Sequence, residues 1–156
     1  MTDFEVARPQ TLHRLIFASR SDIRPGDLPA QLETIVAASV RHNRIAGVTG
    51  LLLAHQGWFL QALEGPAEQV LETYRRIAAD KRVHGAKVLY AGPAILREFA
   101  DWNLTVRTVG IADQPALAAL GMSERFEPLK LSGRCALTLL KAVRAPDEAA
   151  PLRAVG

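Results

Sequence analysis

Short apolar runs and stretches of helical spacing alternate along most of the chain. Residues 12–19 are a short β-prone run, and Pro25 with Gly26 signals a turn after them, so we expect a strand there. Asp27 can cap a helix, and apolar or small residues then recur at helical spacing until Gly47. These positions are Leu28, Leu32, Ile35, Val36, Ser39 and Val40. The pattern therefore predicts a strand followed by a helix.

A β-hairpin is predicted next, because two apolar runs flank a short turn. Residues 48–54 and 58–63 are the runs, and Gln56-Gly57 is the turn between them. Pro66 then suits the first position of a second helix. The apolar stripe of that helix is formed by Val70, Leu71, Tyr74, Ile77 and Ala78.

The resulting order, βαββαββ, predicts an α+β, ferredoxin-like fold with residues 87–91 and 102–109 as the last two strands. The hairpin strands are apolar on both sides, and a sheet with two apolar faces has to be covered twice. The two helices cover one face. We expect a helix over residues 132–144, capped by Ser132, to cover the other face, and the tail from Ala145 to fray.

Length and composition fit one domain: the chain has 156 residues, of which 49% are hydrophobic and 22% charged. We divide it into a main part, residues 1–110, and a helical cap and tail of the same domain, residues 111–156. The formal net charge is only +3. Cys135 is the lone cysteine, which excludes an internal disulfide. The sequence has no apolar run of membrane-spanning length and no signal-like start, so we expect a cytoplasmic protein without a membrane partner.

Common enzymatic motifs are absent from the sequence, so we expect a protein that is not an enzyme. A hydrolase of the acylphosphatase kind would need a phosphate-binding loop, and none is found. Four scattered histidines offer no spaced set of metal ligands, and we expect His55 and His84 to be solvated. Nucleic-acid binding on such a sheet needs exposed aromatic residues on the central strands. These strands are aliphatic, so no nucleic-acid partner is expected.

A few polar residues stand out against this background. Gln61 lies inside an apolar strand and faces the same side as its neighbours Phe59 and Leu63, so it is either satisfied by backbone or lines a pocket under the helices. Asn43 at the end of the first helix is either a helix stop or a pocket residue. Arg76 and Arg82, near the end of the second helix, are either solvated or bind an anion.

Several motifs of the sequence together resemble the BLUF family of blue-light sensors, which bind FAD or FMN. The resemblance runs from residue 12 to about residue 107. It is carried by six segments in the order typical of that family: Leu-His-Arg-Leu-Ile-Phe-Ala-Ser at 12–19, Arg-His-Asn at 41–43, Gly-Val-Thr-Gly-Leu-Leu at 47–52, Phe-Leu-Gln-Ala-Leu-Glu-Gly-Pro at 59–66, Arg-Arg-Ile at 75–77 and Phe-Ala-Asp-Trp at 99–102. It implies the same ferredoxin-like fold, with a flavin between the two helices.

The resemblance also implies roles for individual residues. Asn43 would bind the pyrimidine ring of the flavin, and Gln61 would be the glutamine near N5 and O4 that switches its hydrogen bonds. The other expected flavin-binding residues are His42 and Ser39 beside the ring, Ile35 and Ile77 on its two faces, and Arg76, Arg82 and Lys81 toward the phosphate. An arginine-rich helix end suits a phosphate, and an apolar slot with a few fixed polar groups suits a planar cofactor.

Two positions depart from the family pattern. Phe17 stands where the family has a photoactive tyrosine, which gives an electron and a proton to the flavin in light. Phenylalanine has no O–H to donate. Leu104 stands where a methionine follows Trp102 by two residues, which is a mild change in volume. The sequence leaves open whether Phe17 is a natural divergence or an engineered substitution, and whether Trp102 acts as the electron donor instead.

The resemblance therefore implies a flavin-binding blue-light sensor that signals through noncovalent contacts with a protein partner and that Phe17 impairs photochemically. The identity of that partner does not follow from the sequence, and a homo-oligomer is expected. The alternative is a flavin-free or light-blind interaction module on the same scaffold.

Overall fold

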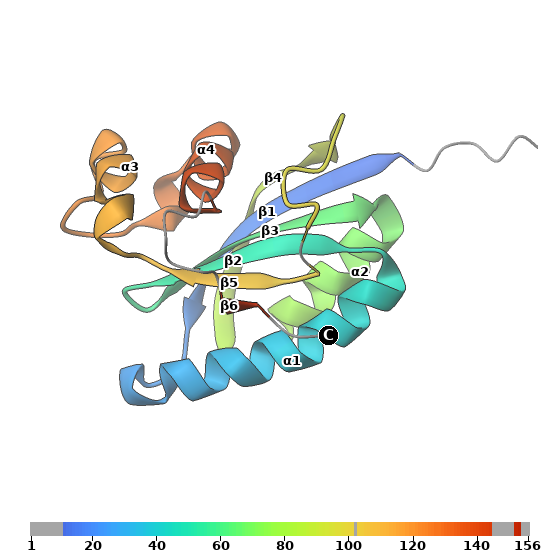
Figure 1. Ribbon diagram of the computed structural model, residues 1–156, viewed down its shortest axis with the longest axis horizontal. Helices are drawn as coiled ribbons and strands as arrows, with labels where there is room; N and C mark the ends of the chain where they lie inside the picture. Colours follow the sequence, from blue (N-terminus) through green and yellow to red (C-terminus); the bar gives the residue numbers. More distant parts are fainter. Residues whose placement is uncertain (1–10, 102, 145–151, 154–156) are drawn as a thin grey trace, which may run out of the picture.

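The computed structural model describes residues 11–101, 103–144 and 152–153. It has a six-stranded sheet in the order β4-β1-β3-β2-β5-β6. The strands are β1 (Leu12–Ser21), β2 (Thr49–His55), β3 (Trp58–Pro66), β4 (Val83–Pro93), β5 (Thr105–Thr108) and β6 (Leu152–Arg153). The helices are α1 (Leu28–Ala46), α2 (Ala67–Ala78), α3 (Gln114–Ala119) and α4 (Gly133–Arg144). Helices α1 and α2 cover one face of the sheet, and α3 and α4 lie on the other (Figure 1).

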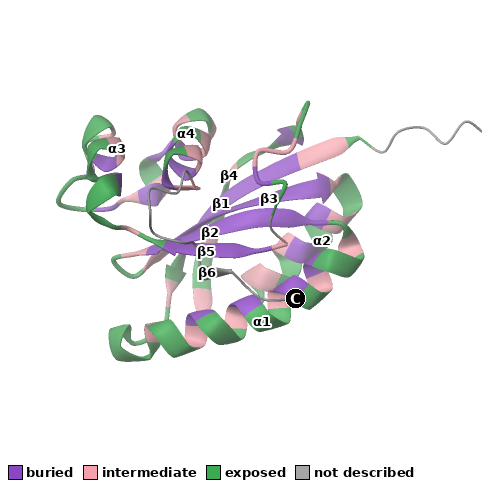
Figure 2. Cartoon of the chain, in the orientation of Figure 1, coloured by how far each residue is buried: buried purple, intermediate pink, exposed green. Residues whose placement is uncertain are grey.

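The central strands are buried on both faces (Figure 2). Side chains of β1 alternate between two cores: Ile16 and Ala18 pack with α4, whereas Leu15 and Phe17 pack with α2. This alternation follows from the two-residue period of a strand. It confirms the predicted α+β, ferredoxin-like architecture with a helical layer on each face. The C-terminal helix is also confirmed, and the Ser132 hydroxyl accepts a hydrogen bond from the amide of Cys135 at 3.1 Å.

Several element boundaries differ from the prediction. Asn43 does not end α1, since the helix continues to Ala46 and Gly47 caps it in the left-handed conformation, at φ 71°. Strand β4 is longer than predicted because it pairs with β1 along nearly its whole length. Strand β5 begins at Thr105, later than predicted. Trp102, expected at the start of that strand, lies outside the described residues.

The expectation of a frayed tail is wrong at its end. Residues 152–153 form β6, which pairs antiparallel with β5. The pairing gives backbone groups at the edge of β5 hydrogen-bond partners that an unpaired edge would lack. Residues 145–151 lie outside the described residues.

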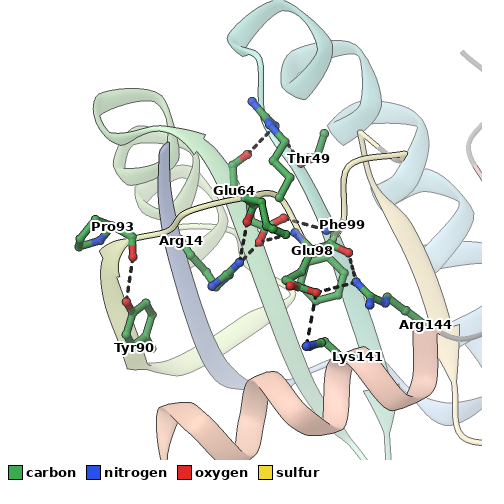
Figure 3. Close-up of polar contacts among 11 residues, drawn as sticks. Arg14, Thr49, Glu64, Tyr90, Pro93, Glu98, Phe99, Lys141 and Arg144 are labelled. Carbon is green, nitrogen blue, oxygen red and sulfur yellow. Dashed lines mark hydrogen bonds and ion pairs between the residues drawn. The ribbon is translucent and has the colours of Figure 1, made fainter. Parts of the chain in front are cut away.

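A fully buried carboxylate, that of Glu64 on β3, ties the β4–β5 loop (residues 94–104) to the sheet (Figure 3). It accepts a hydrogen bond from Arg14 Nε at 2.7 Å. It also accepts the backbone amides of Glu98 at 3.0 Å and Phe99 at 2.8 Å. A buried charge is tolerated when it is paired and hydrogen-bonded in this way. The loop between two strands that are not neighbours in the sheet is therefore fixed at its middle.

Truncation tests the second helical layer. A chain ending at residue 112 lacks α3 and α4, so it exposes the apolar side chains that these helices cover, and we expect aggregation or loss of cooperative unfolding. Size-exclusion chromatography and thermal unfolding measure this. A chain ending at residue 144 keeps both helices and is the matched control. A soluble 1–112 fragment that unfolds cooperatively would contradict the expectation.

Glu64→Gln tests the buried carboxylate. The variant leaves Arg14, which is 9% exposed, without its counter-charge, and we expect unfolding in urea to lose about 3 kcal/mol or more. The exposed Glu33 on α1 provides the control Glu33→Gln, expected within about 0.5 kcal/mol of the unmodified chain. Equal stabilities of the two variants would show that the pair with Arg14 adds nothing.

Candidate functional site

A cavity lies between α1, α2 and the sheet face beneath them, and its space, counted together with the open mouth, is about 770 Å³. All of the residues that the sequence assigned to flavin binding, apart from the exposed Lys81, line it together: Ile35, Ser39, His42, Asn43, Gln61, Arg76, Ile77 and Arg82. They come from α1, β3, α2 and the α2–β4 connection. The fold thus brings into one cavity residues that are far apart in the sequence.

The walls of the cavity are largely apolar. Ile35 comes from α1 and Ile77 from α2, and both pack against the helix-side cores. Leu52 and Phe59 from β2 and β3 line the sheet side. Apolar walls with a few fixed polar groups are typical of sites for flat aromatic ligands.

Gln61 is the polar residue on the sheet side of this cavity. It is 4% exposed and lines the cavity from β3. In the antiparallel register its direct partner on β1 is Phe17. The pocket alternative for Gln61 is thus the one that the geometry favours, because its side chain lies where a ligand edge would meet it.

Asn43 lines the cavity from α1 and is held by the β4–β5 loop. It is 2% exposed, and its Nδ2 donates to the backbone oxygen of Asn103 at 2.7 Å. Its own backbone oxygen accepts the amide of Val48 at 2.8 Å. No other described residue binds the second N–H or the Oδ1 of the side chain, so both are open to a ligand, and the carboxamide cannot rotate without breaking the bond to Asn103.

Thr73 on α2 orients the neighbouring His42. The Thr73 hydroxyl donates to the Gln69 backbone oxygen at 2.7 Å and lies 3.3 Å from His42 Nε2. Since its single proton is used, Nε2 is the donor of the second bond, and Nδ1 is left as an acceptor. Burial, and after it the Arg76 cation, lowers the pKa of His42 below its ordinary value, so the ring is neutral at pH 7. Thr73 was not predicted from the sequence, although it lies four residues before Ile77 and thus on the same helix face.

At the mouth of the cavity a carboxylate holds one of the predicted arginines. Arg82 donates to Asp80 through Nε at 2.9 Å and Nη2 at 2.6 Å. The hydrogen bond from Arg82 is the main cause that lowers the pKa of Asp80, so this carboxyl is ionised at neutral pH. Asp80 was not predicted as a cavity residue. The signal that the sequence offered was its position two residues before Arg82. Arg82 thus has a partner, whereas Arg76 from α2 lines the mouth beside this pair.

Phe17 is buried behind the cavity wall. It is 1% exposed and packs in the cluster of Leu15 and Leu63. Its ring meets that of Tyr74 edge-on, with centroids 4.9 Å apart and an interplanar angle of 76°. The sequence placed Tyr74 in the apolar stripe of the second helix, and the fold brings this side chain against Phe17. Phe17 is not one of the described residues that line the cavity.

Ser19 was also missed as a cavity residue. It is 1% exposed and lines the cavity from β1, and its buried hydroxyl has no hydrogen-bond partner within the part of the chain that the structure describes. An unpaired buried hydroxyl is costly unless a ligand or water satisfies it. Leu104, the other departure from the family pattern, is 2% exposed and packs beneath α1 with Val106.

Within the described ranges, no group of His, Cys, Asp and Glu is placed to hold a metal ion. None of the helices described is long and apolar enough to cross a membrane.

Comparisons with known proteins all point to one family. Residues 12–105 match the family model of BLUF, sensors of blue-light using FAD. The blue light- and temperature-regulated antirepressor BluF of Escherichia coli (strain K12) is 39% identical over 80 residues, which are 51% of this chain and 20% of that protein. The beta subunit of a photoactivated adenylate cyclase from Euglena longa is 29% identical over 110 residues, 70% of this chain and 13% of that protein. The chain thus spans a fifth or less of these curated relatives.

Solved structures extend the likeness to the fold. The dark-state structure of BlrB, a BLUF protein, has a TM-score of 0.68 and 30% identity, and the match covers 87% of this chain and 96% of that one. The photo-activated state of BlsA has a TM-score of 0.80 at 23% identity, covering 89% and 99% of the two chains, which shows a shared fold. Because the family model matches most of the chain and BlrB matches nearly end to end, the chain belongs to the BLUF family of flavin-binding blue-light sensor domains.

Proposed function

We propose that this BLUF domain binds its flavin in the cavity between α1 and α2 and that Phe17 limits its response to blue light. The observation that carries the first part is the convergence of the expected binding residues on one cavity. The Ser19 hydroxyl is buried in the same cavity and has no partner among the residues described, so a ligand with heteroatoms would satisfy it.

Each end of the cavity would hold a different part of the cofactor. Ile35 and Ile77 would lie on the two faces of the ring system. The free N–H and Oδ1 of Asn43 would pair with the donor and acceptor atoms of the pyrimidine ring, and Gln61 would reach the ring from the sheet. His42, neutral and oriented by Thr73, would offer Nδ1 as an acceptor.

The mouth of the cavity would hold the phosphate side. Arg76 is the principal candidate, because charge-assisted bonds from an arginine to phosphate are strong. Arg82 contributes less than the sequence implies, because Asp80 already accepts two of its donors. FAD and FMN share the ring system and the first phosphate, so this arrangement suits both.

Bound flavin supplies absorption of blue light and an excited state that accepts an electron. The chain has to supply a donor of an electron and a proton next to Gln61. Phe17 has no O–H proton to give, and its ring is harder to oxidise than a phenol. We therefore propose that the photoresponse is impaired. A flavin-free or light-blind interaction module is the second candidate function. It is favoured by Phe17, because this position carries no phenol.

The domain would act as a non-enzymatic module that signals through a protein partner and associates with copies of itself. Relatives named for an antirepressor and for a cyclase join BLUF sequence to different outputs. The partner of this chain is therefore not carried over from either relative.

Arg76→Ala tests the phosphate assignment. Loss of one charge-assisted bond should weaken FAD binding by about tenfold, whereas riboflavin, which lacks a phosphate, should bind nearly as before. Titration followed by flavin fluorescence measures both affinities. Arg75→Ala, at the exposed neighbouring position, is the control and should change neither. Equal weakening of FAD and riboflavin would contradict the assignment, and absence of any flavin binding by the unmodified chain would contradict the cavity itself.

Illumination tests the role of Phe17. With FAD bound, the unmodified domain should show no lasting red shift of its flavin absorption after blue light. Phe17→Tyr should restore a reversible shift of several nanometres, because the phenol would stand opposite Gln61 in the register. Tyr74→Phe removes the phenol that contacts Phe17 and serves as the control. A shift in the unmodified chain that Tyr74→Phe abolishes would make Tyr74 the donor and would contradict the proposed impairment.

A further inference from the structure

A second pocket lies at the end of the sheet where β1 ends, β2 turns into β3 and α1 begins. The start of α1 and the β2–β3 hairpin lie at the same end of the molecule (Figure 1). The lining includes Ile23 and Leu28 from the β1–α1 side and Ala54, Trp58 and Phe59 from the hairpin. Its space, counted together with its open mouth, is about 690 Å³.

This second pocket adjoins the mouth of the cavity between α1 and α2. Phe59 lines both of them. The backbone amide of Asp22 donates to the Arg82 backbone oxygen at 2.8 Å, and Asp22 lies in the chain between two residues that line the pocket, Ser21 and Ile23. Because Arg82 lines the mouth of the cavity, only this stretch of backbone separates the mouth from the pocket. A ligand that leaves the cavity past Arg82 can therefore reach the pocket.

In the described part of the chain, no residue that lines the second pocket is charged at neutral pH. Its titratable residue is His55, which is half-buried, contrary to the expectation from the sequence that it is solvated. Burial lowers the pKa of this ring below its ordinary value, so the ring is neutral at pH 7. A phosphate would find no cation in this lining. A flat, uncharged aromatic base would instead bury apolar surface there.

The wall formed by the β2–β3 turn is held rigidly. Gln56 Nε2 donates to the Glu124 backbone oxygen at 3.2 Å, and Gln56 Oε1 accepts the amide of Phe126 at 2.8 Å. These bonds retain Gln56 in the left-handed conformation, at φ 50°, which is costly for a residue other than glycine. Trp58 is held as well, since Arg20 Cζ lies 4.3 Å from the centroid of its ring. A wall ordered in this way loses little conformational entropy when a ligand binds.

We propose that the second pocket is the subsite for the adenine base of FAD, so that this domain binds FAD more tightly than FMN. The inference rests on the proposed function, because it continues the flavin from the phosphate side at Arg76 and Arg82 into the neighbouring pocket. FAD exceeds FMN by an adenosine monophosphate joined to the first phosphate, and its base is the uncharged, flat part that lies beyond the mouth. An uncharged pocket with aromatic residues in its wall suits that base and not the phosphates.

The ratio of the dissociation constants of FMN and FAD tests the subsite. We expect the unmodified chain to bind FAD about tenfold more tightly than FMN. The preference should be the same in about 0.15 M and about 0.5 M NaCl, because salt screens charges and the pocket has none. Equilibrium dialysis measures both constants. Equal affinities, or a preference that salt abolishes, would overturn the inference and leave the proposed flavin cavity intact.

Ser21→Phe fills the second pocket without adding a charge. The variant should bind FAD only as tightly as FMN, and its affinity for FMN should be unchanged, because FMN has no base to place in the pocket. Ser123→Phe is the matched control at an exposed position that lines neither the pocket nor the cavity, and it should keep the preference for FAD. If Ser21→Phe does not fold, Leu28→Asn removes apolar wall from the same pocket and should reduce the preference. Retention of the full preference in a folded pocket variant would overturn the subsite.

Adenosine separates this inference from the proposed function. If no flavin binds to the chain, the proposed function fails, and adenosine alone then decides the subsite. At concentrations on the order of millimolar, adenosine should shift the amide NMR signals of Ile23 and Gly57, and Ser21→Phe should abolish these shifts. Absence of the shifts in that case would overturn the subsite. A pocket that takes a side chain of a protein partner instead would give the same negative result.

Discussion

The rest of the structure depends on the hydrogen bonds and the ion pair of the buried Glu64 carboxylate. It lies on a central strand, where burial of an unpaired charge would be prohibitive. Its partners come from β1 and from the middle of the β4–β5 loop, so satisfying this one charge also positions that loop. The loop, once fixed, supplies Asn103 to the helix that lines the cavity and Glu98 to the helix on the other face. The requirement for charge compensation inside the sheet thereby organises both layers that surround it.

The sequence predicted the architecture well because hydrophobic pattern decides it. Strands apolar on both sides require two covering layers, and the helical stripe at the C-terminal end supplied the second one. The cavity residues were predicted because the motifs around Asn43 and Gln61 resemble a known family. Thr73, Asp80 and Ser19 were missed because their importance depends on neighbours that only the fold provides: a histidine one helix away, an arginine around a turn, and a cavity above a strand. The pairing of residues 152–153 could not be predicted either, since a two-residue strand has no periodicity to detect.

Phe17 illustrates a similar limit. Its identity was plain in the sequence, but its surroundings were not, and the contact with Tyr74 joins a strand to a helix more than fifty positions later. Position 17 has no phenol, but the phenol ring of Tyr74 contacts the ring of Phe17. The surroundings of Phe17 therefore include a second aromatic position, which the sequence motifs do not record.

The pairing of Arg82 with Asp80 has a consequence for selectivity among flavins. Two cations and one carboxylate at the cavity mouth leave about one net positive charge, in a region where water and salt enter. At physiological ionic strength such a field decays over about 8 Å, so at the mouth it would act alike on the single phosphate of a mononucleotide and on the two linked phosphates of a dinucleotide. Discrimination between a mononucleotide and a dinucleotide would then have to come from uncharged contacts outside the mouth.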